Sequence, residues 1–200
     1  MIYQQPFNDP LNYYYYNLTF DDKQIKKILL DLESIEYSEA SILGTQDKDD
    51  KSEIQDISEI RQSKIKWIPN TEEWKWVYER MMTIVLEANK SLWHFDIFNC
   101  EPIQYTEYHD YLSGHYDWHH DLGSGFASHR KISISVQLSD PQTYNGGELQ
   151  IKLNGDKVTS IPKKLGDATI FPSYLLHRVN PVTSGTRKSL VMWVGGNHFR

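Results

Sequence analysis

The hydrophobic positions of the first hundred residues recur at helical spacing in two segments. Asp21 and Gln24 form a capping-box pattern, and apolar residues then repeat every three or four positions as far as Leu32. Asn70 and Glu73 predict the start of a second helix in the same way. The buried stripe predicted for this second helix comprises Trp74, Val77, Met81, Ile84, Val85 and Ala88. The pattern therefore predicts two amphipathic helices, each with one buried face.

Strand patterns flank these helices and dominate the second half of the chain. Residues 13–19 and 36–43 have strand propensity, and residues 61–67 alternate loosely before Pro69. From residue 101 onward, short β-branched and aromatic runs alternate with turn residues. The strands predicted there are 102–109, 130–138, 147–153, 157–161, 168–171, 177–180 and 187–195. Asn145-Gly146 and Asn154-Gly155 predict tight hairpins. Short strands at this spacing are typical of a sandwich or barrel.

Length and composition favour one packed domain spanning residues 1–200. The chain is 39% hydrophobic and 13% aromatic, which is typical of a globular protein rather than a disordered one. It has no apolar run of the roughly 18–20 residues that a membrane span requires, and no leader pattern at its start. Cys100 is the single cysteine, which favours a reducing compartment. We therefore expect a soluble cytoplasmic protein with no membrane partner.

The formal net charge of −6 is concentrated in one segment. Residues 45–60 contain six acidic residues and two lysines, a local balance of −4. An acidic chain without a basic stripe is a poor candidate for binding a phosphate backbone, so a nucleic-acid partner is not expected. We interpret this acidic segment as a solvated loop. The alternative is a loop that recruits a basic substrate or folds over it.

Four residues carry the clearest chemical signal in the chain. His119 and Asp121 form a His-x-Asp pair, His177 follows 58 residues after His119, and Arg187 lies ten residues further on. Two imidazoles and one carboxylate can occupy one face of an octahedral ion, as in the facial triad of non-haem Fe(II) oxygenases. On a strand, residues at i and i+2 point to the same face. A guanidinium is suited to bind a carboxylate in two-pronged fashion. The set predicts Fe(II) together with a dicarboxylate co-substrate.

An ordered series of motifs surrounds these residues over roughly residues 101–196. It comprises Gly114–Asp121, Leu138–Pro141, Tyr144–Leu149, Gly166–Ala168, Phe171-Pro172, His177–Val179, Pro181-Val182, Gly185–Arg187 and Trp193. This series resembles the Fe(II)/2-oxoglutarate-dependent dioxygenase superfamily. More closely, it resembles the prolyl-4-hydroxylase-like branch, which includes the PKHD-type hydroxylases of bacteria and phages. The resemblance implies a mainly β (α+β) fold, a double-stranded β-helix (jelly roll, cupin-like) with supporting N-terminal helices. The helical support would occupy about residues 1–100 and the iron-binding core about 101–196.

The resemblance also implies a cofactor set and a reaction. His119, Asp121 and His177 would bind Fe(II) and act in catalysis, and Arg187 would fix the distal carboxylate of the co-substrate 2-oxoglutarate. With O2, 2-oxoglutarate would be decarboxylated to succinate and CO2 while a substrate C–H bond is hydroxylated. Ascorbate is a candidate additional cofactor. In related halogenases a small residue replaces the acid, so Asp121 favours hydroxylation.

Other residues are candidates for lining the co-substrate and substrate sites. The family usually has a tyrosine about nine residues before the first iron histidine, but position 110 is Asp here. Tyr108 and Tyr111 are the alternatives, and we favour Tyr108. The remaining co-substrate candidates are Ser189 and either Gln137 or Ser135, and the candidates for the substrate wall are Trp118 and Tyr116. Each could instead be an ordinary strand or packing residue. His120 lies between the two ligands and is not expected to bind the metal.

One loop and three functional hypotheses remain open. Gly123-Ser124-Gly125 could form a lid over the substrate or an ordinary surface loop. The favoured function is hydroxylation of a peptidyl residue such as proline. The alternatives are the same chemistry on a free amino acid, a small metabolite or a nucleobase, and a non-catalytic jelly roll that only binds a ligand. Nucleic-acid demethylases of the superfamily have a second arginine shortly after the first, whereas here the next one is Arg200. The pattern does not predict the oligomeric state.

Overall fold

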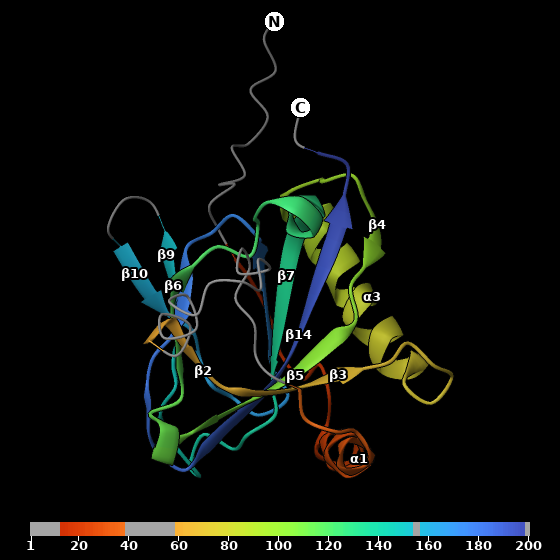
Figure 1. Ribbon diagram of the computed structural model, residues 1–200. Coiled ribbons are helices and arrows are strands. Elements are labelled where there is room, and N and C mark those ends of the chain that lie inside the picture. The colour runs from red at the N-terminus through yellow and green to blue at the C-terminus, as the bar shows by residue number, and fades with distance from the viewer. Residues whose placement is uncertain (1–12, 39–58, 154–156, 199–200) are drawn as a thin grey trace, which may run out of the picture.

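The structure is a computed structural model that describes residues 13–38, 59–153 and 157–198. Its first half contains β1 (Tyr14–Tyr16), α1 (Asp22–Asp31), η1 (Leu32–Ser34), β2 (Arg61–Gln62), β3 (Lys64–Ile68), α3 (Lys75–Leu92) and β4 (Ile97–Cys100). Its second half contains β5 (Ile103–His109), η2 (Asp110–Leu112), β6 (His115–His119), η3 (Gly125–His129), β7 (Arg130–Gln137), β8 (Asn145–Gly146), β9 (Leu149–Leu153), β10 (Lys157–Ser160), β11 (Ala168–Pro172), β12 (His177–Val179), β13 (Val182–Ser184) and β14 (Thr186–Gly196). Figure 1 shows the strands grouped together, with α1 and α3 outside them.

The strands form two main antiparallel sheets. The larger, seven-stranded sheet has the order β1-β11-β7-β14-β5-β3, with β4 paired to β14. The smaller, five-stranded sheet has the order β10-β9-β12-β6-β2, and β13 pairs with β8 in a separate ribbon. From β5 onward the chain crosses repeatedly between the two sheets, with β5, β7, β11 and β14 in the larger and β6, β9, β10 and β12 in the smaller, as expected for a jelly roll. The predicted mainly β fold with supporting helices is confirmed.

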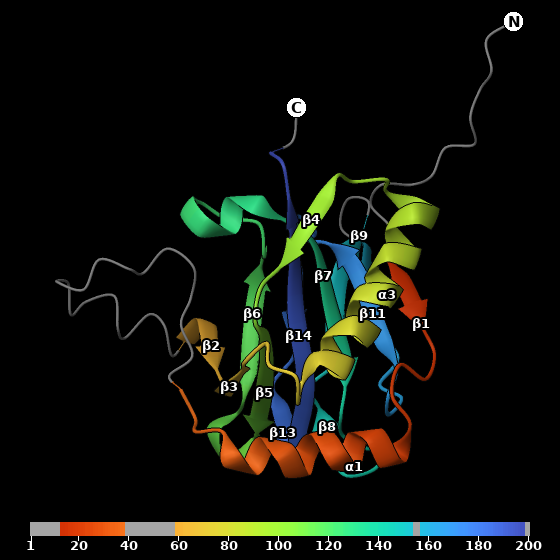
Figure 2. The same ribbon diagram turned by 90° about the vertical axis from the view of Figure 1, so that its right-hand side faces the viewer.

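Side-chain alternation along the large sheet separates a helix-facing side from an inner side. The helix-facing residues of β7 and β14 are Ile132, Ile134, Val136, Leu190, Met192 and Val194, and they share one hydrophobic cluster with α3. Figure 2 shows α3 lying across this face of the sheet, with α1 running along its lower end. The intervening positions face the smaller sheet. They include the polar residues Gln104, Thr106, Ser133, Ser135, Arg187 and Ser189. The alternation thus directs polar groups into the space between the sheets.

The two predicted helices are present, but only the first begins where the pattern predicts. In α1, the Asp21 side chain accepts from the Gln24 backbone and the Gln24 side chain accepts from the Asp21 backbone, which confirms the capping box. The prediction of a cap at Asn70 with Glu73 was wrong, because α3 begins at Lys75 after a turn that ends at Trp74. Trp74 is almost fully buried, so packing rather than a local cap sets this start. No helix within the described ranges is long and apolar enough to cross a membrane.

Several strand predictions need correction. Asn145 and Gly146 do not close a hairpin between adjacent strands. They form β8, which pairs with β13, while the positive φ angles fall at Gly146 and Gly147. Within the first hundred residues, β1 lies in the strand predicted at 13–19 and β2 and most of β3 in the one predicted at 61–67, whereas β4 was not predicted.

Some predictions fall in parts of the chain that are not described. Of the predicted strand at 36–43, residues 36–38 are described, and among these Ser38 forms an isolated bridge to Ile65. Residues 39–43, most of the acidic segment 45–60, and the turn at Asn154-Gly155 lie outside the described residues. The strands on either side of that turn, β9 and β10, do pair with each other.

Candidate active site

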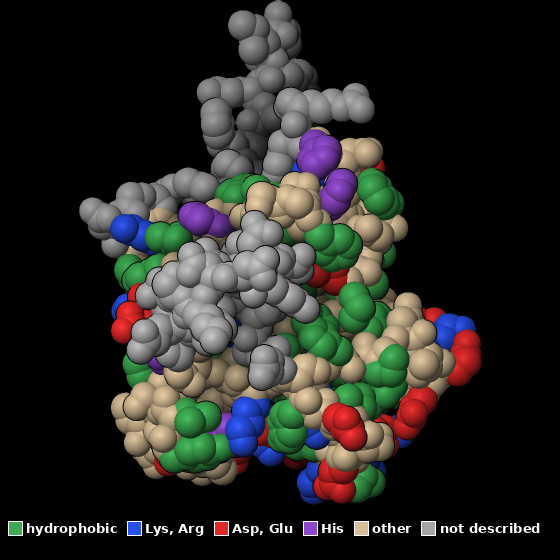
Figure 3. Space-filling view, in the orientation of Figure 1, with side chains coloured by type: hydrophobic (Ala, Val, Ile, Leu, Met, Phe, Trp, Pro, Cys, Tyr) green, Lys and Arg blue, Asp and Glu red, His purple; other side chains and the backbone are tan. Residues whose placement is uncertain are grey.

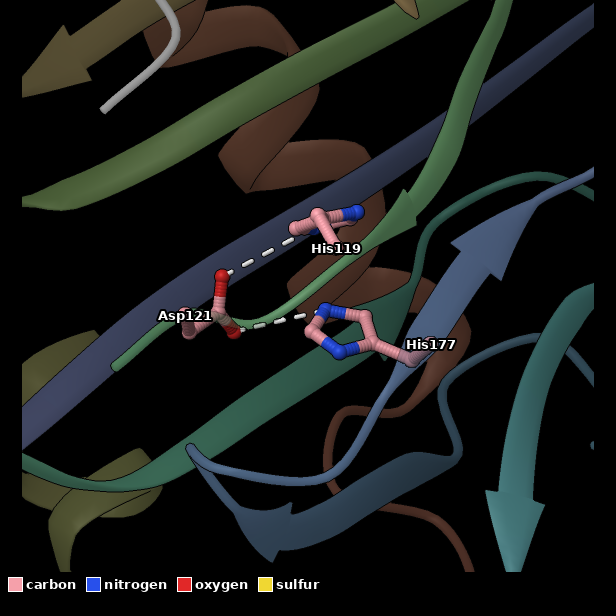
Figure 4. A group of neighbouring side chains, drawn as sticks. All are labelled: His119, Asp121 and His177. Carbon is pink, nitrogen blue, oxygen red and sulfur yellow. Dashed lines mark ion pairs between the residues drawn. The ribbon is translucent and has the colours of Figure 1, made fainter. Parts of the chain in front are cut away.

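Three side chains converge between the sheets. His119 ends β6 and His177 begins β12, and the two are directly paired across the ladder. Asp121 lies two residues beyond β6, where its backbone N–H donates to the Ser173 carbonyl at 2.9 Å. The Asp121 carboxylate lies 3.8 Å from Nε2 of His119 and 3.4 Å from Nε2 of His177. Figure 4 shows both imidazoles directed at this carboxylate. A turn rather than strand alternation therefore brings Asp121 to the predicted position.

Hydrogen bonds fix which atoms these residues offer. Nδ1 of His119 lies 2.7 Å from the Asp117 carbonyl, and Nδ1 of His177 lies 2.8 Å from the Leu175 carbonyl. A carbonyl only accepts, so each Nδ1 carries the proton and each Nε2 presents a lone pair. Burial, reinforced by His177, lowers the pKa of His119 to about 3, so that imidazole is neutral.

The carboxylate is oriented by a residue of the large sheet. The Ser133 hydroxyl donates to Oδ2 of Asp121 at 2.6 Å. Burial alone would raise the pKa of Asp121, but both histidines and this hydroxyl lower it below its ordinary value. The ligand atoms of His119, Asp121 and His177 lie within 4.8 Å of one another and could hold a metal ion. Two imidazole nitrogens and one ionised carboxylate fit Fe(II), with open positions for other ligands.

A cavity of about 380 Å³ extends from this triad to Arg187. Arg187 is only 4% exposed, and its guanidinium lies 3.2 Å from the Ser189 hydroxyl. The ion pairs between described residues do not include Arg187. A buried charge is costly unless an opposite charge offsets it. Arg187 is therefore suited to an anionic group that enters the cavity.

The predicted co-substrate residues cluster around Arg187. Tyr108 pairs with Arg187 across the β5–β14 ladder, and the guanidinium lies 5.5 Å from the centre of its ring. Tyr108, Ser189 and Ser135 all line the cavity. Gln137 instead lines a smaller second cavity, which Arg187 also lines, and donates to the Tyr144 hydroxyl at 2.8 Å. The structure therefore brings Tyr108, Ser189 and Ser135 nearer to the triad than Gln137.

The two predicted substrate-wall residues lie on opposite faces of β6. Tyr116 lines the cavity and stacks on His119, with ring centroids 3.4 Å apart and planes inclined by 11°. Tyr116 and His119 lie three residues apart but share a face of β6, because the register of its pairing with β12 shifts between them. Trp118 faces the other way and lies under the Arg178 guanidinium at 4.6 Å, so the structure does not bring it into the cavity. His120 also points away, with Nδ1 2.7 Å from the Tyr174 carbonyl.

The outer end of the cavity contains residues that the sequence patterns missed. Glu101 accepts two hydrogen bonds of 2.6 Å from Arg130, whose guanidinium lies 4.0 Å from the centre of the Trp193 ring. Arg61 donates to Gln104 at 2.8 Å and lies over the Tyr116 ring. Glu101, Arg130 and Arg61 come from separate segments, and no local spacing connects them. Trp193 belonged to the motif series, but its position at the cavity end did not follow from that series.

Comparisons with known proteins agree with this geometry. Residues 103–195 match the model of the 2OG-Fe(II) oxygenase superfamily. A PKHD-type hydroxylase of Colwellia psychrerythraea is 41% identical over 86 residues, covering 36% of this chain and 38% of that protein. One of Hyphomonas neptunium is 43% identical over 74 residues, covering 36% and 33%. The matches thus span little more than a third of these curated relatives.

Solved structures show the same fold over most of the chain. A prolyl hydroxylase from Trichoplax adhaerens, solved with a peptide fragment of hypoxia inducible factor, has a TM-score of 0.72 at 18% identity, covering 94% of this chain and 88% of that one. A Pseudomonas putida prolyl-4-hydroxylase has a TM-score of 0.67 at 17% identity, covering 92% of each chain. At these identities the likeness concerns the fold alone. Together with the family match and the geometry of the triad, it confirms the predicted resemblance of residues 103–195 to the 2OG-Fe(II) oxygenase superfamily.

Proposed function

We propose that this protein is an Fe(II)- and 2-oxoglutarate-dependent dioxygenase that hydroxylates a C–H bond of a peptidyl residue such as proline. One observation carries the proposal. One cavity contains a triad that could hold a metal ion at one position and, at another, a buried arginine that forms no ion pair with the described part of the chain. The first feature suits a cation and the second suits an anion, which are the two components that this chemistry requires.

The protein residues bind and orient these components. His119, Asp121 and His177 would hold Fe(II), and Ser133 keeps the carboxylate of Asp121 oriented. Arg187, supported by its contacts with Ser189 and Tyr108, would hold the distal carboxylate of 2-oxoglutarate. Bound Fe(II), with O2 and 2-oxoglutarate, would supply the oxidising chemistry that yields succinate, CO2 and a hydroxylated product. The buried walls limit access of water to the reacting groups.

The substrate class rests on the relatives rather than on a bound ligand. The related structures are named as prolyl hydroxylases, one of them in complex with a peptide fragment. The cavity also has an outer end with aromatic walls, which suits a side chain presented from a larger molecule. The same chemistry on a free amino acid, a small metabolite or a nucleobase is the second candidate. A ligand-binding role without turnover is the least supported, because the triad and Arg187 are both present.

A turnover assay tests the proposal. The purified chain is supplied with Fe(II), O2 and 2-oxoglutarate, and succinate release is measured across proline-containing peptides, free amino acids and oligonucleotides. We expect peptide-stimulated succinate release and a product heavier by one oxygen atom, with no release from His177→Ala. Parallel reactions with and without ascorbate test the need for that compound. Succinate release stimulated only by non-peptide compounds would contradict the proposed substrate class.

We also propose a location in a reducing compartment such as the cytoplasm. The chain has one cysteine, Cys100, which is half-buried on β4 and forms no disulfide within the chain. Fluorescence microscopy of a tagged chain tests this location.

A further inference from the structure

Phe126 combines two properties that rarely occur together. Its side chain is 72% exposed, yet it lines the same cavity as His119, Asp121 and Arg187. Single exposed hydrophobic residues are common on protein surfaces and by themselves require no explanation. Phe98 on β4 is such a case, because it is 65% exposed and lies outside the cavity lining. Phe126 differs from it in being part of the candidate active site.

The turn that carries Phe126 is held in place at both ends. Before it, the backbone N–H groups of Asp121 and Leu122 both donate to the Ser173 carbonyl at 2.9 Å. After it, Ala127 is fully buried, and its N–H donates to the Ser124 carbonyl at 3.2 Å. The Ser128 hydroxyl also closes the turn by donating to the Gly125 carbonyl at 2.6 Å. The chain therefore holds the aromatic ring at the rim while its neighbour is buried.

Gly125 contributes to this arrangement through its backbone conformation. Its φ is +56°, in the left-handed region, and a Cβ placed there would meet no atom within 4 Å. The glycine is thus required by conformation and not by lack of space. The Gly123-Ser124-Gly125 segment, predicted as either a lid or an ordinary loop, is the turn that places Phe126 at the cavity.

The surroundings of Phe126 determine what kind of group fits beside it. Trp67 and Trp193 also line the cavity, with ring centroids 6.3 Å apart. Among the charged residues that line the cavity, Arg130 already binds Glu101 and Arg61 already binds Gln104. Figure 3 shows hydrophobic side chains exposed on one face of the molecule. An apolar group can gain contact area here without disrupting these polar pairs.

We propose that Phe126 is a specificity-determining residue that contacts an apolar side chain adjacent to the substrate residue being hydroxylated. The inference rests on the proposed function and makes it more specific. It predicts that the protein prefers substrates with leucine or phenylalanine beside the target residue over those with aspartate. The acidic group would have to lose its hydration against an aromatic ring that offers it no partner.

The test compares capped peptides in which the two residues flanking a central proline are both leucine or both aspartate. We expect wild-type kcat/KM to favour the leucine peptide, and Phe126→Ala to reduce this preference by about tenfold, the usual discrimination from one apolar contact. Phe126→Leu should retain the preference within about threefold. Phe98→Ala, which removes an equally exposed ring outside the cavity, should leave it unchanged. The KM for 2-oxoglutarate should be the same in every variant. Equal preference in wild type and Phe126→Ala, or no wild-type preference, would overturn the inference.

A binding measurement separates failure of this inference from failure of the proposed function. Absence of peptide hydroxylation would refute the proposed substrate class. The contact at Phe126 can still be tested by saturation-transfer NMR with N-acetyl-phenylalaninamide and protein loaded with Zn(II) and 2-oxoglutarate. We expect a signal with wild type and Phe98→Ala and its loss with Phe126→Ala. No signal with wild type would overturn the inference.

Discussion

The two faces of the β5–β14 ladder carry opposite kinds of buried charge. On the inner face, Arg187 pairs in register with Tyr108 and forms no ion pair within the described parts of the chain. On the outer face, the next pair is Lys188 and Glu107. Glu107 is 6% exposed and accepts hydrogen bonds from Tyr105 at 2.5 Å and Tyr37 at 3.0 Å. Its Oε2 also lies 2.8 Å from Nε2 of His109, and its Oε1 lies 3.9 Å from Nζ of Lys188.

The difference is that the fold compensates the buried charge of Glu107 but leaves the charge of Arg187 available to a ligand. The carboxylate of Glu107 has four polar partners, so its burial is compensated within the fold. The guanidinium of Arg187 lies near the Ser189 hydroxyl and the Tyr108 ring, and no acid of the described residues forms an ion pair with it. A buried charge that the fold leaves without an opposite charge indicates that a ligand supplies one. Adjacent residues on one ladder can thus serve stability and binding separately.

Loss of a metal ligand should have the largest effect on the inner face. We expect His119→Ala, Asp121→Ala and His177→Ala each to weaken Fe(II) binding by more than about 100-fold, because loss of mere supporting contacts already costs roughly 10–100-fold. Anaerobic calorimetry measures this effect. Glu107→Gln is the control and should bind Fe(II) as the wild type does. Undiminished affinity after any of the three substitutions would remove that residue from the triad.

Loss of Arg187 should have the next largest effect and should concern 2-oxoglutarate only. Removing one partner of a buried charge pair costs on the order of 2–5 kcal/mol. Arg187→Ala should therefore raise the 2-oxoglutarate dissociation constant roughly 30-fold or more, with little change in Fe(II) affinity. Arg187→Lys should recover part of the loss, since it keeps the charge but not the planar fork. Anaerobic titration, followed by metal-to-ligand absorbance, provides the measurement. Wild-type affinity in Arg187→Ala would show that another residue holds the distal carboxylate.

In unfolding experiments, substitution of Glu107 on the outer face should have a larger effect than substitution of Arg187 on the inner face. Glu107→Gln should lower the free energy of unfolding of the metal-free protein by about 1–3 kcal/mol, because it disturbs a partnered buried group. Arg187→Met, which keeps much of the side-chain volume, should be neutral or stabilising. Urea unfolding followed by tryptophan fluorescence compares the two variants. The proposed division of roles fails if Arg187→Met is the more destabilised protein.

The smallest effect should be a dependence of stability on acid pH. Burial alone would raise the pKa of Glu107, but hydrogen bonds from Tyr105 and Tyr37 and the nearby positive charges lower it below its ordinary value of 4.5. The folded protein thus binds this proton less readily than the unfolded chain does. The resulting stabilisation is complete above about pH 4.5 and is lost as the pH falls through the lowered pKa. Wild type should therefore lose stability between pH 5 and 3 more steeply than Glu107→Gln in urea unfolding. Equal slopes would show that Glu107 does not contribute.

Features that depend on local or motif spacing could be predicted from the sequence. The capping box of α1 involves residues three apart, and the apolar stripe of α3 depends only on helical periodicity. The triad was predicted because His119, Asp121 and His177 lie in a recognisable motif order. The structure brings these three residues together and places Arg187 in the same cavity.

Features that depend on contacts between distant segments could not be predicted. Asn145-Gly146 has a hairpin signature, but the strands on either side of it enter different sheets, so its partner is β13. The register shift in β6 turns Tyr116 into the cavity and leaves Trp118 outside. Arg61 and Gln104 meet across 43 positions of sequence. In each case the decisive interaction belongs to another strand, which local propensity does not describe.

Strand β14 also fixes distances along the cavity. Arg187, Ser189, Val191 and Trp193 occupy alternate positions along it and all line the cavity. Six residues of strand separate the first from the last, a length of about 20 Å. Hydrogen-bonded strands on both sides, β5 and β7, hold this length, so the separation between Arg187 and Trp193 is fixed. One residue inserted between Arg187 and Trp193 would lengthen the strand by one residue and turn the cavity-lining side chains on one side of the insertion to the opposite face of the sheet. The spacing between Arg187 and Trp193 on β14 therefore helps to set the length of the molecule that the cavity can hold.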